Sequence, residues 1–192
     1  MTSRSALGAI GLSVVVALAG CSRRLEDCPP VPSAQPVDSV LLAFLSRARA
    51  AHHAADRAEQ AGDLARAARL LGELIQGPIP GAAAPPVEAR EVLADTRARL
   101  AELSSRGSDF DAADAHLRAG LELVPDAGYF RGHLFEVRGV VEERRAKALA
   151  AKGDTQGAAA ANQRALDALE QAMAIQADVI RGATDTGGAG SR

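Results

Sequence analysis

The stretch from Asp109 to Pro125 reads DFDAADAHLRAGLELVP and has the pattern of one helix with a marked beginning and end. The Asp109 carboxylate can accept a hydrogen bond from the first turn, and its charge suits the positive end of a helix. Apolar and small residues then follow at steps of three and four, which places them on one face. Pro125 cannot continue the helix. The stretch therefore predicts a helix over 110–124 with one buried face.

The beginning of this helix has two counterparts in the chain. Gly62-Asp63 and Gly153-Asp154 lie, like Ser108-Asp109, between two segments of helical periodicity. Each aspartate can start the second helix, and glycine tolerates the positive φ that ends the first. Small residues near these turns let two antiparallel helices approach closely. Alanines stand four residues after each aspartate and seven residues before each Gly or Ser, at Ala67, Ala113, Ala158 and at Ala55, Ala101, Ala146.

The helical period extends from these turns over most of the chain. No stretch alternates apolar and polar residues for long enough to suggest a strand, so the fold class is predicted to be all-α. A loop rich in Gly and Pro interrupts the pattern at 77–86, and the tail from Gly182 holds four glycines and is predicted to be disordered. Helices are expected over 38–61, 64–75, 87–106, 110–124, 130–152 and 154–180. The expected organisation is a signal peptide at 1–20, a tether at 21–37, a helical domain at 38–181 and a disordered tail at 182–192.

The segment Asp109–Pro125 resembles a repeat of the tetratricopeptide family, including its closing proline. The resemblance extends over about 140 residues and implies helical hairpins stacked as a short α-solenoid of about three irregular repeats. The hairpins recur after 46 and then 45 residues, whereas the period of the family is 34. The first helix of each pair is therefore expected to be elongated. The alternative is an unrelated bundle of hairpins, because other Ala-rich hairpins also use Gly-Asp at the turn.

The same resemblance implies a concave groove lined by the first helix of each hairpin. This surface is mostly polar with a slight acidic excess, so a protein partner with a polar or basic segment is expected. The aromatic cluster Tyr129, Phe130 and Phe135 is predicted to pack between the second and third hairpins, with a partner-facing patch as the alternative. The groove positions transferred to this chain are Arg49, His52, Asp56, Glu59, Gln60, Asp95, Ala98, Glu102, Ser105, Arg106, Val140, Glu143, Lys147, Ala150 and Ala151.

At the N-terminus, Leu18-Ala19-Gly20-Cys21 resembles the lipobox of bacterial lipoproteins. It follows Arg4 and an apolar run over 6–19, which is too short for a permanent membrane span and reads as a cleaved signal. The resemblance implies that Cys21 carries lipid and becomes the first residue of the mature chain. The alternative is an ordinary signal peptide that ends in a chance cysteine. The Pro-rich segment 22–37 is expected to be an extended tether, and Ser22 leaves export to the outer membrane permitted, so that membrane is favoured over the inner one.

Composition excludes several classes of function. The chain has 22 basic and 24 acidic residues, and removal of 1–20 takes away only Arg4, which leaves a net charge of −3. No basic excess is present for nucleic acid. The sequence has neither a nucleophile elbow nor a phosphate-binding glycine loop, and His52, His53, His116 and His133 show no metal-ligand spacing. We therefore expect no catalysis, no metal and no cofactor. Cys28 lies in the tether, so no intramolecular disulfide is available once Cys21 is lipidated.

These features give two readings of function. The first is a membrane-anchored envelope lipoprotein that acts as a protein–protein interaction adapter through its helical repeats. The second is a structural tether or spacer without a specific peptide-binding groove. The charge run Glu142-Glu143-Arg144-Arg145 is predicted to be a solvated helix face.

Overall fold

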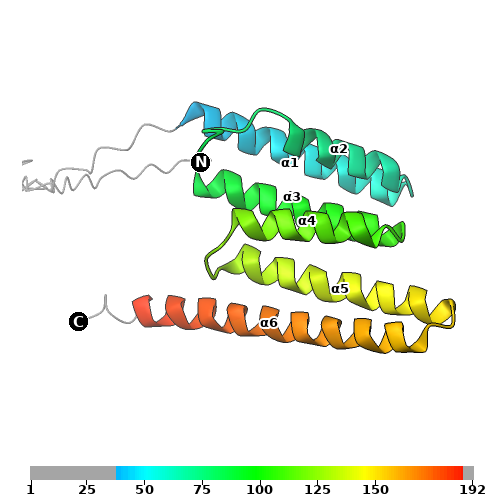
Figure 1. Cartoon of the computed structure of the whole chain (residues 1–192). Coiled ribbons are helices and arrows are strands. Elements are labelled where there is room, and N and C mark those ends of the chain that lie inside the picture. The colour runs from blue at the N-terminus through cyan, green and yellow to red at the C-terminus, as the bar shows by residue number, and fades with distance from the viewer. Residues whose placement is uncertain (1–37, 188–192) are drawn as a thin grey trace, which may run out of the picture. The chain divides into compact units, whose positions relative to one another are not determined.

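The computed structural model describes residues 38–187, so the signal segment, Cys21, Cys28 and the tether lie outside the described part. The described chain is all-helical, which confirms the predicted fold class (Figure 1). The first five helices begin and end within one residue of the predicted bounds. The helices are α1 (Ser39–Gln60), α2 (Leu64–Gln76), α3 (Val87–Arg106), α4 (Phe110–Leu123), α5 (Tyr129–Ala151) and α6 (Thr155–Gly187).

The helices pack as three antiparallel hairpins, α1/α2, α3/α4 and α5/α6, that follow one another in chain order (Figure 1). The first helix of a later hairpin packs on both helices of the hairpin before it: α3 contacts α1 and α2, and α5 contacts α3 and α4. Within residues 38–187, the second helices α2, α4 and α6 do not contact one another. Each later hairpin is therefore joined to the one before it through its own first helix.

The turn inside each hairpin has the same construction. Gly62, Ser108 and Gly153 have φ values of 78°, 62° and 80°, and the following aspartate donates its backbone N–H to the carbonyl five residues earlier. This pairing is the Schellman motif, which ends a helix at a residue of positive φ. The aspartate then caps the next helix: Asp63 Oδ1 accepts from Arg66 N at 2.9 Å, and Asp109 Oδ1 accepts from Ala112 N at 3.0 Å. The predicted turn chemistry is confirmed.

Small residues fill the helix interfaces where the sequence places them. All six repeated alanines are buried, four of them completely. The cluster between the second and third hairpins includes Ala98, Ala101 and Ala113 beside larger side chains such as Leu117 and Leu134. Because Cβ is the whole side chain of alanine, the helix backbones come close enough for the larger residues to interlock around them.

The third hairpin packs through a different stripe. The inward face of α6 is made of alanines, and α5 opposes it with Gly132 and Gly139. A Cβ on Gly139 would lie 2.7 Å from Leu169 Cγ, so glycine is required for this close approach. The inward alanines are Ala158, Ala161, Ala165, Ala168 and Ala172.

Helix α6 also runs further than predicted. It continues to Gly187, so residues 182–187 are helical rather than part of a disordered tail. An ion pair between Asp178 and Arg181 spans one turn, and Thr184 Oγ1 donates to the Arg181 carbonyl at 2.8 Å. These local bonds support the helix over 178–184, where the side chains are exposed. Because the tail is rich in glycine, the sequence predicted that the helix ends earlier than it does.

Ser108 provides a direct test of the turns, because it is the one non-glycine residue of positive φ in residues 38–187. Ser108→Gly is expected to raise the free energy of unfolding by about 0.5–1 kcal/mol, since a left-handed conformation costs an L-residue more than glycine loses in chain entropy. Gly62→Ala should lower it by about 1 kcal/mol, although nothing lies within 4 Å of the new Cβ. Urea denaturation of both variants measures the two effects. If both substitutions changed the free energy of unfolding in the same direction, the positive φ assigned to these two turn residues would be contradicted.

Candidate interaction surface

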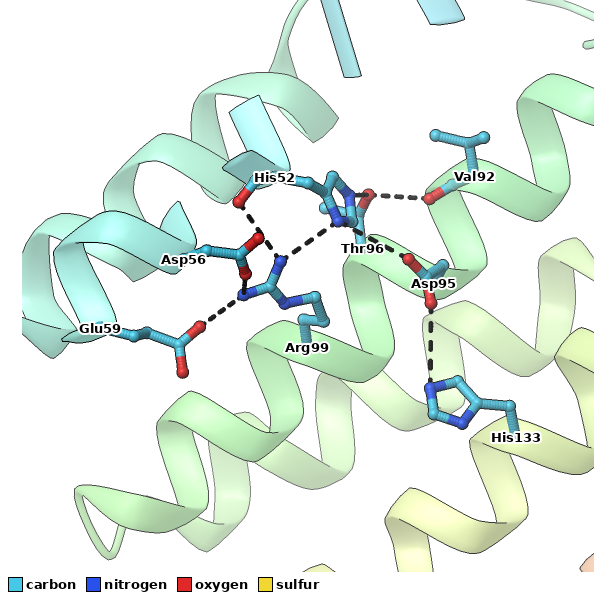
Figure 2. Close-up of polar contacts among 8 residues, drawn as sticks. All are labelled: His52, Asp56, Glu59, Val92, Asp95, Thr96, Arg99 and His133. Atoms are coloured by element: carbon cyan, nitrogen blue, oxygen red, sulfur yellow. Dashed lines mark hydrogen bonds and ion pairs between the residues drawn. The ribbon is translucent and has the colours of Figure 1, made fainter. Parts of the chain in front are cut away.

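Side chains from three first helices meet on one face of the hairpin stack (Figure 2). Asp95 of α3 lies between His52 of α1 and His133 of α5. Its Oδ2 is 3.6 Å from His52 Nδ1, and its Oδ1 is 3.8 Å from His133 Nε2. One carboxylate of α3 therefore lies beside a histidine from each of the other two hairpins.

Thr96 fixes the orientation and tautomer of His52. The Thr96 hydroxyl donates to the carbonyl of Val92 at 2.7 Å, so its oxygen is free to accept. His52 Nε2 lies 2.9 Å from this oxygen and must therefore carry the proton that it donates. The other nitrogen, Nδ1, is left facing Asp95 and Arg99, as Figure 2 shows.

Arg99 joins α3 to the carboxylates of α1. Its Nη2 lies 2.8 Å from Asp56 Oδ1 and 2.5 Å from Glu59 Oε1, and Arg106 Nη1 reaches Glu59 Oε2 at 2.7 Å. Two carboxylates expected in an acidic groove are thus paired with arginines of the same chain. Their negative charge is largely compensated before a partner arrives.

Other predicted groove positions lie between hairpins. Ala98 is fully buried and Ser105 is 3% exposed, and Arg144 of α5 donates to Ser105 Oγ at 2.8 Å. The structure therefore places these two residues in the α3–α5 contact, where no partner can reach them. At these two positions, transfer from the shorter repeat selected the side of α3 that faces the next hairpin. Arg49, Gln60, Glu143, Lys147, Ala150 and Ala151 are exposed, whereas Glu102 and Val140 are half-buried.

The carboxylates with uncompensated charge lie further along the stack. Among the described residues, Asp95 has histidines but no arginine or lysine within ion-pair distance, and Glu136 Oε2 lies 3.4 Å from His133 Nδ1. Histidine loses its charge near neutral pH, whereas arginine keeps it. The ring of Tyr129, 60% exposed, stacks on His133 with 6.1 Å between ring centroids. We call Asp95, Tyr129, His133 and Glu136 the α3–α5 carboxylate surface.

The aromatic residues predicted to pack between hairpins divide into two groups. Phe135 is 5% exposed, and Phe130 packs against the cluster between the second and third hairpins. Tyr129 instead points outward and joins the carboxylate surface. Arg99, Thr96, His133 and Glu136 were not assigned to an interaction surface from the sequence. A signal was available for three of them: Arg99 lies four residues after Asp95 and three before Glu102, and Glu136 and His133 lie four and seven residues before Val140.

The run Glu142–Arg145 is not the solvated face predicted for it. Glu142 is 7% exposed and accepts from Arg164 Nε and Nη2 at 3.0 and 2.8 Å. Arg145 Nη2 lies 2.6 Å from Asp114 of α4. Only Glu143 of the run is exposed. The partners lie 22 and 31 residues away, so local charge patterning could not reveal them.

Burial lowers the pKa of two histidines. For His52 burial is the main cause, with Asp95 opposing it and Arg99 adding to it. For His116 burial again leads, and the Arg97 guanidinium, 3.1 Å from its Nδ1, lowers the pKa further. In the unfolded chain both imidazoles take a proton near pH 6.5. The unfolded state therefore binds more protons than the native state just below that pH.

This difference predicts that stability falls as the pH falls. The contribution is fully present above about pH 6.5 and is lost as the pH drops toward the lowered native pKa values. We expect a smaller free energy of unfolding at pH 5.5 than at pH 7.5, measured by urea denaturation. The double variant His52→Gln, His116→Gln should show a smaller difference between the two pH values. If the double variant kept the full difference in the free energy of unfolding between the two pH values, groups other than these two histidines would be its cause.

Within residues 38–187, no group of three or more His, Cys, Asp or Glu side chains is arranged to hold a metal ion. No helix of the same part combines the length and the apolar character that a membrane crossing requires. In comparisons with known proteins, no family model, no curated protein and no solved structure matches the chain.

Proposed function

We propose that this protein is a lipid-anchored adapter of the bacterial cell envelope, whose helical domain binds other proteins. In this proposal Cys21 carries the lipid, 22–37 is the tether, and the hairpins form a short α-solenoid similar to tetratricopeptide repeats. The order of packing supports the repeat arrangement, because each later first helix packs on both helices of the preceding hairpin. Such stacking is the way in which repeat domains build one extended surface.

The single observation that carries the binding role is the meeting of His52, Asp95 and His133 from three first helices on one face. His52 is held there by Thr96 and Arg99, and a side chain held by its neighbours loses little freedom when a partner binds, which favours affinity. The surface they form carries carboxylates at Asp95 and Glu136 without arginine partners in residues 38–187. Tyr129 adds an exposed ring that can contact a cation through its face.

The partner is therefore a protein segment that carries Lys or Arg side chains. It contacts the α3–α5 carboxylate surface rather than the carboxylates of α1, which Arg99 and Arg106 already pair. Exposed charges of this kind steer association more than they set affinity. Binding is of moderate strength and sensitive to salt. The outer membrane, facing the periplasm, is the proposed location.

The experiment uses the full chain, expressed with its N-terminal segment and a C-terminal tag in a bacterium. Mass spectrometry of the mature protein should find lipid on Cys21, and Cys21→Ala should leave an unprocessed precursor. An unmodified thiol at the mature N-terminus would contradict the anchor.

Partner binding is tested on the same extracted protein with a Lys/Arg-rich peptide as the probe. Asp95→Asn with Glu136→Gln should weaken capture about threefold or more at low salt, and raising salt should weaken capture by the wild type. Asp111→Asn with Glu122→Gln is the matched control, because it removes equal charge from exposed positions of α4. Equal losses in the two double variants would show that only net charge matters and would contradict a specific surface.

A further inference from the structure

His133 of α5 lies between the two acidic side chains of the α3–α5 carboxylate surface. Its Nε2 is 3.8 Å from Asp95 Oδ1 of α3, and its Nδ1 is 3.4 Å from Glu136 Oε2, three residues further along α5. Figure 2 shows the ring turned toward Asp95. The Tyr129 ring lies nearly parallel to it, with 5° between the two planes. Each ring nitrogen of His133 therefore faces a carboxylate from a different helix.

The protonation of this ring decides how many carboxylates it binds. A neutral imidazole has one N–H, so it donates to either Asp95 or Glu136 and turns a lone pair toward the other. An imidazolium has two N–H groups and a positive charge, so it donates to both carboxylates in charge-assisted hydrogen bonds. A single proton on His133 therefore engages both acidic side chains, which the neutral ring cannot do.

The other charged groups near the ring do not compete for this role. In residues 38–187, no arginine or lysine lies within ion-pair distance of Asp95 or Glu136. Arg99, on the same helix as Asp95, is directed to two carboxylates of α1. Among the described residues of α4 and α6, no charged group pairs with His133. The charge of the carboxylate surface therefore depends on the state of its own histidine.

His52, the second histidine beside Asp95, is less available for a proton. Burial lowers the pKa of His52, Asp95 opposes this effect, and Arg99 adds to it. His52 also faces one carboxylate within ion-pair distance, whereas His133 faces two. The side chain of His133 is 26% exposed, so it exchanges protons with solvent directly. We therefore assign the pH response of the surface to His133.

Histidine is the side chain whose charge changes between about pH 5 and 8. We propose that His133 is a pH switch of the α3–α5 carboxylate surface, which binds a Lys/Arg segment when the ring is neutral and releases it when the ring is protonated. This inference rests on the proposed binding of a basic segment and names how that binding is regulated. The proton and the segment compete for the same two carboxylates, so each weakens the binding of the other.

The test is capture of the Lys/Arg-rich peptide by the full, detergent-extracted chain at pH 7.5 and at pH 5.5, at equal ionic strength. The Lys and Arg side chains of the probe stay charged at both values. The wild type should capture the peptide about three- to fivefold more weakly at pH 5.5. The effect is of this modest size because each exposed ion pair that the peptide must break contributes little by itself.

Two substitutions fix the charge at position 133. His133→Gln is neutral at both pH values, so its capture should differ little between them. His133→Lys is positive at both, so its capture should be weak at both. His53→Gln is the matched control, because His53 is exposed on α1 and lies outside the carboxylate surface, and it should keep the wild-type ratio of capture. Circular dichroism at both pH values checks that each variant stays folded.

The outcomes separate the switch from the binding surface. Wild-type capture that is equal at the two pH values would overturn the switch and leave the surface standing. The same holds for a His133→Gln variant that keeps the full pH dependence of the wild type. Absence of capture at either pH would instead contradict the basic partner, and with it the switch.

Discussion

Ala113→Trp is expected to lower the free energy of unfolding of the helical domain by about 3 kcal/mol or more. Ala113 is fully buried in the cluster between the second and third hairpins, where Ala98 and Ala101 hold the helices close together. An indole ring can enter only if α3 and α4 separate, and overpacking of this kind costs about 1–3 kcal/mol even for smaller insertions. Urea denaturation followed by circular dichroism measures the loss.

Ala115→Trp is the matched control on the same helix. Ala115 is exposed, so the same ring should cost only about 0.5 kcal/mol, the difference in helix propensity. Comparable losses at the two positions would mean that the helix itself, rather than the close contact at Ala113, is sensitive to tryptophan. An unchanged midpoint for Ala113→Trp would contradict the hairpin packing.

Glu142→Ala is expected to cost about 2 kcal/mol, because a buried carboxylate that accepts charged hydrogen bonds is lost. Its Oε2 accepts two hydrogen bonds from Arg164, and its Oε1 lies 3.4 Å from Arg145 Nε. The side chain of Arg145 is only 20% exposed, so water replaces the lost carboxylate poorly there. Arg164 is half-exposed and limits the total cost.

The neighbouring Glu143→Ala serves as the control, since it removes the same group from an exposed position on the same helix. Its effect should lie within about 0.5 kcal/mol of zero, as expected for a surface substitution. A free energy of unfolding for Glu142→Ala equal to that of Glu143→Ala would show that the ion pairs around Arg145 contribute nothing measurable.

The helices were predictable because their ends are encoded locally. Asp63, Asp109 and Asp154 each cap a helix with their own side chain, and the residue before each takes the positive φ. These bonds join residues three to five apart, so a short window of sequence contains all the information. The end of α6 escaped prediction because Gly182 and Gly187 lie in a helix there, against their usual preference.

The interaction surface was only partly predictable, for the opposite reason. His52, Asp56, Glu59, Asp95 and Arg106 were identified, yet their partners depend on how α1 and α3 are rotated against each other. Arg99 pairs with carboxylates 40 and 43 residues away, and no local pattern reports that distance. The same uncertainty led to Ala98 and Ser105 being assigned to an open groove, whereas they lie inside the stack.

The way in which the hairpins join has a consequence for cooperativity. Within residues 38–187, α1 and α2 do not contact α5 or α6, so the outer hairpins are coupled only through α3 and α4. The stability of such an array is close to a sum of nearest-neighbour terms. The middle hairpin therefore sets whether the domain unfolds as one unit or in two steps. A weakened α3–α5 contact would let the last hairpin open while the first two remain folded, a partial unfolding that hydrogen exchange would detect as loss of protection confined to α5 and α6.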